Sequence, residues 1–127
     1  MIPLIDQQSL AAIDIPTMVM FGTLDELETI EHNATRVWDN ISSQTKSLVT
    51  IENGTHTFFL KCGPGLAGAF FEMCTGPVWD KDRIFDVSNH MITAFLMAQL
   101  YGDTDAAAAL APDAVQFPGI QYEAAGF

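Results

Sequence analysis

The stretch Ile15-Pro16-Thr17-Met18-Val19-Met20-Phe21-Gly22-Thr23-Leu24-Asp25-Glu26 decides the fold of this chain, because an apolar run without alternation leads straight into Gly-x-x-Asp. A strand that is apolar on both faces is typical of a parallel sheet covered by helices on both sides. We therefore expect a strand at about residues 17–22, with the carboxylate of Asp25 just past its tip. The Pro16 ring is tolerated at the start of such a strand.

A second apolar stretch, at about residues 46–52, ends in Asn53-Gly54-Thr55-His56. Between the two stretches, from Glu26 to Ile41, apolar residues recur every three or four positions, which predicts an amphipathic helix. A right-handed strand–helix–strand unit makes the two strands parallel neighbours and brings their carboxyl ends to one edge of the sheet. The fold class expected is therefore α/β, with Asp25 and His56 at a common edge.

The rest of the chain is predicted to be mainly helical. A long helix is expected from about Asp82 to Leu100, with Gly102 at its carboxyl-terminal cap, and a short alanine-rich helix follows at about 104–110. The tail from Phe117 contains the breakers Pro118 and Gly119, and the expected sheet has two strands. We divide this single domain into an N-terminal segment (1–14), the strand–helix–strand unit (15–56), a loop (57–81) and C-terminal helices with a tail (82–127).

Charge excludes some partners. The 127 residues include 16 acidic and five basic side chains, for a formal net charge of -11. Such a chain repels phosphate backbones and anionic lipid surfaces, so nucleic acid is not expected as a partner. No apolar run reaches the roughly 18 residues of a membrane span, and the first residues lack the features of a signal peptide. The localisation is left open, since an address could lie on a longer precursor.

Cys62 and Cys74 flank a Gly- and Pro-rich segment. They could form a disulfide or remain buried free thiols, and the sequence leaves both open. Their spacing, together with three scattered histidines, gives only a weak metal signal, and no metal ligand is assigned.

Asp25 and His56 are the candidate site residues. An acid and then an imidazole, each just past a strand, match the second half of a catalytic triad in the chain order nucleophile, acid, histidine. The acid would hold the imidazole in one tautomer and stabilise its protonated form. Taken alone, however, Asp25 could be an ordinary aspartate that caps a helix, and His56 an exposed loop histidine.

On these residues the chain resembles the carboxyl-terminal third of α/β-hydrolases, in particular the predicted dienelactone hydrolase and platelet-activating-factor acetylhydrolase-like group. The resemblance runs from about residue 14 to residue 123. It is carried by residues 15–26, 53–56, 82–90, 93–96 and 117–123. It implies a hydrolase of carboxylic esters or lactones that needs no metal or organic cofactor, with Asp25 as the triad acid and His56 as the general base.

The nucleophile that this chemistry needs is missing. Such enzymes place a serine or cysteine on a Gly-x-Ser-x-Gly turn earlier in the chain, and no such turn occurs here. Ser42, Ser43 and Ser47 lie around the start of the second strand, so they should lie at the opposite edge of the sheet from His56. The serines of the chain are Ser9, Ser42, Ser43, Ser47 and Ser88. Cys62 or Cys74 could approach His56, but no feature of the sequence suggests a lowered thiol pKa.

Two functions therefore remain. The chain either contributes the acid and histidine of an esterase whose serine lies outside it, or is a non-catalytic interaction module or inactive truncated hydrolase. A two-stranded sheet leaves an open apolar edge, so we expect a homo-oligomer or pairing with a missing amino-terminal half. Metal-dependent chemistry ranks last. We expect His32 to lie on a solvated helix face and His90 to have a structural role near Asp86.

Overall fold

A computed structural model describes residues 6–25, 34–56 and 78–127 of the chain. The elements in this part are α1 (Gln7–Ala11), β1 (Thr17–Leu24), α2 (Ala34–Asn40), β2 (Lys46–Thr55), α4 (Lys81–Tyr101), α5 (Thr104–Ala109) and β3 (Ile120–Ala125). Both expected strands are present and each extends further toward its carboxyl end than predicted. The helix expected at 26–41 is described only from Ala34, and most of the loop expected at 57–81 lies outside the described residues.

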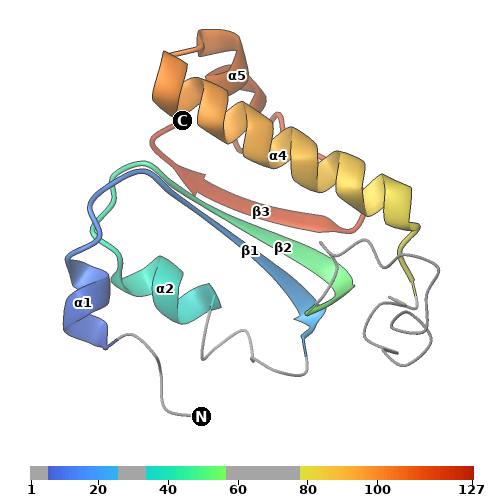
Figure 1. Cartoon of the computed structure of the whole chain (residues 1–127), viewed down its shortest axis with the longest axis horizontal. Coiled ribbons are helices and arrows are strands. Elements are labelled where there is room, and N and C mark those ends of the chain that lie inside the picture. Colours follow the sequence, from blue (N-terminus) through green and yellow to red (C-terminus); the bar gives the residue numbers. More distant parts are fainter. Residues whose placement is uncertain (1–5, 26–33, 57–77) are drawn as a thin grey trace, which may run out of the picture.

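The described sheet has three strands in the order β1-β2-β3 (Figure 1). β1 and β2 are parallel, as predicted, with Thr17 opposite Lys46 and Gly22 opposite Ile51. The prediction of a two-stranded sheet was wrong, because the tail forms β3, which pairs antiparallel with β2. Pro118 and Gly119 interrupt the chain before β3 and do not prevent the strand that follows them.

Helices cover both faces of this sheet. Figure 1 shows α4 and α5 on one side and α1 and α2 on the other. The strands alternate accordingly: Val49 and Ile51 of β2 pack on the α4 side, whereas Leu48 packs with Phe21 and Ala34 on the α2 side. This two-sided burial explains why the strand sequences are apolar without alternation. The mixed α/β class predicted from them is confirmed.

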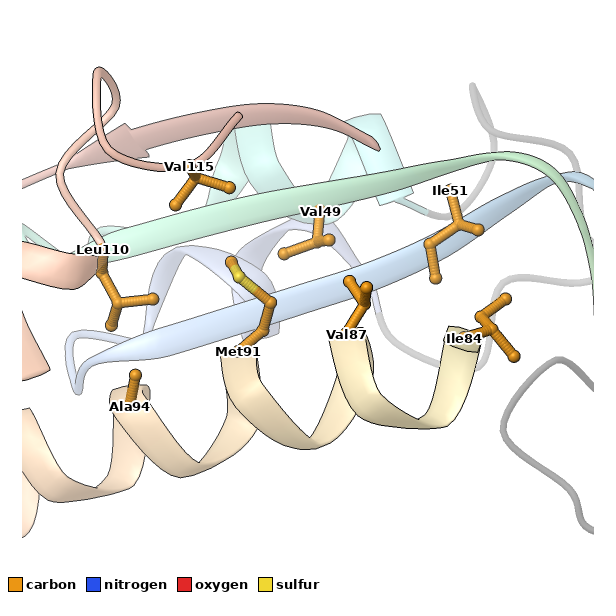
Figure 2. Close-up of a cluster of buried hydrophobic side chains, with 8 residues drawn as sticks. All are labelled: Val49, Ile51, Ile84, Val87, Met91, Ala94, Leu110 and Val115. Carbon is orange, nitrogen blue, oxygen red and sulfur yellow. The ribbon is translucent and has the colours of Figure 1, made fainter. Parts of the chain in front are cut away.

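The larger core lies between the sheet and α4. Figure 2 shows the side chains of Ile84, Val87 and Met91 extending from one face of the helix toward Val49 and Ile51 of β2. Ile51 and Met91 are fully buried. Residues three or four apart on α4 form this buried stripe, as the periodicity of the sequence predicts.

Capping residues mark both ends of α4. The Asp80 carboxylate accepts a hydrogen bond from the Arg83 amide, which satisfies a free N–H group of the first turn. At the other end Gly102 adopts φ 67° and closes the helix.

One side of α4 keeps an apolar surface in solvent, since Ile92 is 43% exposed and Leu100 is 70% exposed. No helix in the described ranges is both long and apolar enough to cross a bilayer.

Candidate functional site

Asp25 and His56 meet at the carboxyl ends of β1 and β2. The last Cα pair of the two strands is Leu24 with Thr55, and each candidate residue comes directly after its member of that pair. His56 Nδ1 lies 2.8 Å from Asp25 Oδ2, which is a hydrogen bond. The expected meeting of these two side chains at a common edge is confirmed. Their catalytic role stays a prediction.

The hydrogen bond between Asp25 and His56 determines which ring nitrogen carries the proton. An ionised carboxylate only accepts hydrogen bonds, so the proton lies on Nδ1 of the neutral imidazole and Nε2 is left as an acceptor. The Asp25 side chain is 9% exposed and that of His56 is 43% exposed. Within the described ranges the Asp25 bond is the one hydrogen bond that the ring makes. An Nε2 that carries no proton is chemically able to take one from an approaching hydroxyl group.

The two strands do not reach this edge in a regular ladder. Gly22 and Leu24 are two positions apart in β1, whereas their partners Ile51 and Thr55 are four positions apart in β2. The extra residues form a bulge at 52–54, hereafter the β2 bulge, in which Asn53 takes the left-handed conformation with φ 57°. Bulges of this kind often occur beside active sites, where they redirect a side chain.

Polar contacts and a close backbone approach hold the β2 bulge. The Asn53 amide donates to Thr23 Oγ1 over 2.8 Å. The Glu52 amide donates to the Gly119 carbonyl oxygen over 2.9 Å, and the Glu52 carbonyl oxygen accepts from Trp79 Nε1 over 2.6 Å. Segments that lie far apart in the sequence therefore converge on two residues of β2, Glu52 and Asn53.

None of the five serines reaches His56 by a hydrogen bond. Ser42 and Ser43 bond to backbone oxygens before β2 begins, and Ser47 is paired with Met18 at the amino end of the sheet, as predicted. Ser9 lies in α1. Ser88 is buried in α4, and its hydroxyl group has no hydrogen-bond partner among the residues that the structure describes.

The other candidates from the sequence fall into two groups. Cys62, Cys74 and His32 lie outside the described residues. His90 is exposed on α4, and its ring meets the Phe117 ring edge-on with centroids 5.5 Å apart. Its structural role near Asp86 stays a prediction. Within the described ranges no three acidic, histidine or cysteine side chains are grouped so that they could hold a metal ion.

Sequence analysis missed the residues that support the pair. Neither Thr23 nor Trp79 belongs to a motif, and nothing in the linear sequence links either of them to the β2 bulge. The two glycines, Gly22 and Gly54, were a usable signal, because a glycine in a strand often marks a bulge or a close backbone approach.

Comparison of the chain with protein-family models, with curated proteins and with solved structures gave no match.

Proposed function

We propose that this chain supplies the acid and the general base of a serine-type hydrolase of carboxylic esters or lactones. His56 takes the proton of an attacking serine hydroxyl at Nε2, and Asp25 orients the imidazole through Nδ1. The serine comes from a polypeptide segment outside the sequence described here. No metal or organic cofactor takes part.

One observation carries this proposal: the 2.8 Å bond between His56 Nδ1 and Asp25 Oδ2 at the carboxyl ends of neighbouring parallel strands. A general base of this type needs a buried carboxylate on one ring nitrogen and open access at the other. The exposures of 9% for Asp25 and 43% for His56 meet both needs. A helix-capping aspartate beside an unrelated loop histidine would not require this pairing.

The test is to produce the chain from its own genomic locus, with the flanking DNA, and to treat the purified material with a fluorophosphonate probe. We expect a labelled serine on a polypeptide that is continuous with this chain or purifies with it. The same preparation should hydrolyse p-nitrophenyl acetate. His56→Ala should lower that hydrolysis by roughly 10³-fold, since loss of the base removes the activation of the serine. The isolated 127-residue chain should show neither labelling nor His56-dependent turnover.

His90→Ala is the matched control, because it removes an exposed histidine that does not contact the Asp25–His56 pair. Its hydrolysis rate should equal that of the unmodified chain. Labelling and hydrolysis that persist in His56→Ala would refute the proposal, and so would the absence of any labelled serine from the preparation.

A non-catalytic interaction module is the second candidate, and an exposed apolar surface supports it. Leu96, Leu100 and Tyr101 on α4 are 45%, 70% and 77% exposed. Among the described strands β1 pairs with β2 alone, so its other edge also offers backbone groups for pairing. Self-association through either surface would work against a net charge of -11 on each chain, and should therefore strengthen with added salt.

Light scattering at increasing salt tests this second candidate. Self-association that is lost in Leu96→Glu/Leu100→Glu would support the α4 surface. A monodisperse monomer at all salt concentrations would rule out self-association and leave the hydrolase proposal unaffected.

A further inference from the structure

The register of the two strands shows how His56 comes to face Asp25. Gly22 is opposite Ile51, and a regular parallel ladder continued from that pair would place Asp25 opposite Gly54. His56 would then lie two residues further along its strand, or about 6.5 Å beyond Asp25 at the usual rise of a strand. The β2 bulge takes up these two residues, and Leu24 is opposite Thr55 instead.

Each residue of the β2 bulge has its own support. The backbone of Glu52 is held on both sides, by the Gly119 carbonyl oxygen and by the Trp79 indole. The Asn53 amide is held by the Thr23 hydroxyl group. Gly54 is packed against β1 so closely that a Cβ added to Gly22 would lie 2.3 Å from the Gly54 carbonyl oxygen.

The bulge residues themselves lie outside the main core, although Trp79 packs against that core. Val49, Ile51 and the buried face of α4 form that core without any residue of the bulge. Asn53 also adopts the left-handed conformation, which is unfavourable for residues with a Cβ, although asparagine tolerates it better than most. A strained, multiply anchored segment directly before a site residue points to a positioning role.

From this geometry we infer that the β2 bulge positions His56 against Asp25, with Gly22 and Thr23 of β1 as its positioning residues. Gly22 leaves room for the Gly54 backbone, and Thr23 fixes the orientation of the Asn53 peptide. The inference rests on the proposed function for its purpose, since the positioning matters for catalysis only if the pair acts as acid and base. The geometry itself can be tested without any activity.

The test measures the ¹⁵N chemical shifts of the His56 ring, which report the fraction of imidazole that carries its proton on Nδ1. At about pH 8 the unmodified chain should be mainly in this form, because Asp25 accepts that proton. Gly22→Ala forces the Gly54 carbonyl away and should make the Nδ1–H form the minor one. Thr23→Val should lower its fraction less and should speed hydrogen exchange of the Asn53 amide by at least about tenfold, while Thr23→Ser, which keeps the hydroxyl group, should restore both.

Met91→Ala is the control for a general loss of stability, because Met91 is buried under α4 and makes no hydrogen bond with the bulge. It should leave the His56 tautomer unchanged. If Gly22→Ala does not fold, the comparison of Thr23→Val with Thr23→Ser decides. The inference is overturned if folded Gly22→Ala or Thr23→Val keeps the unmodified tautomer fraction, or if Met91→Ala changes it equally.

The two proposals can fail separately. A tautomer change in these variants without any labelled serine would refute the hydrolase and leave the positioning role standing. Hydrolysis that depends on His56 but is unaffected by Gly22→Ala would support the hydrolase and refute the positioning role.

Discussion

The α4 face of the sheet and the β2 bulge are built from the same strand by different means. Under α4, Val49 and Ile51 of β2 are fully buried against apolar side chains, in a ladder with regular register. Directly after Ile51 the ladder between β1 and β2 breaks at residues 52–54. Hydrogen bonds and a glycine contact hold this segment. The first region depends on buried apolar surface, which tolerates small shifts of a side chain. The second depends on the directions of particular bonds.

The difference separates residues that stabilise the fold from residues that orient the Asp25–His56 pair. Apolar burial contributes most of the free energy of folding but does not aim any one side chain. Hydrogen bonds contribute less net free energy, but they fix orientation. We therefore expect substitutions under α4 to lower stability and leave the Asp25–His56 pair intact, and substitutions around the bulge to disturb the pair at a smaller cost in stability.

The largest stability effect should come from Met91→Ala. Met91 is completely buried between α4 and the sheet, and truncation leaves a cavity that costs about 2–5 kcal/mol. Urea unfolding followed by circular dichroism measures this loss. A cost below about 1 kcal/mol would mean that the α4 face is not the main core.

Asn53→Val should have the next largest effect. Its φ of 57° is accessible to asparagine and glycine but strained for a β-branched residue, at a cost of about 1–2 kcal/mol. Asn53→Gly is the matched control and should unfold at nearly the urea concentration of the unmodified chain. Equal stabilities for the valine and glycine variants would mean that residue 53 is not held in the left-handed conformation.

Trp79→Phe should cost less, about 1 kcal/mol, because it removes one hydrogen-bond donor and keeps an aromatic ring. The indole Nε1 donates to the Glu52 carbonyl oxygen, so the loss should be local. Amide exchange at the β2 bulge should accelerate more than exchange at Val49 and Ile51. Uniform acceleration along β2 would instead mean that the indole hydrogen bond stabilises the whole strand and not the bulge in particular.

The smallest effect should appear at alkaline pH. Burial raises the pKa of Tyr122 above its ordinary value of 10.0. The folded chain therefore resists ionisation of this phenol more than the unfolded chain does. Its contribution to stability is complete below about pH 10 and is lost as the pH rises through the higher, folded pKa. Tyr122→Phe should lose less stability over that range, and an identical alkaline decline in both chains would contradict the shift.

The predictable part of this structure is the part that apolar patterns encode. The parallel strands, α4 and the meeting of Asp25 with His56 follow from local periodicity and from the rules of strand–helix–strand units. β3 was not predicted, because Pro118 and Gly119 are typical of loops and the alternating segment that follows them is short. Its residues do alternate, with Ile120 and Tyr122 toward the core and Gln121 and Glu123 exposed.

The β2 bulge could not be predicted in the same way. Its length depends on how Gly22 packs against Gly54 and on anchors at Trp79 and Gly119, which lie far from it in the sequence. No local propensity encodes contacts of that range. The sequence could therefore indicate which edge of the sheet carries the site, but not how the two side chains come into register.

The central claim is that Asp25 holds the proton of the His56 ring on Nδ1. Ring ¹⁵N shifts of the unmodified chain and of Asp25→Ala, compared at about pH 8, test it most directly. We expect the Nδ1–H tautomer to dominate in the unmodified chain and to become the minor form in Asp25→Ala, with β2 and β3 still paired. The same tautomer mixture in both chains would contradict the account.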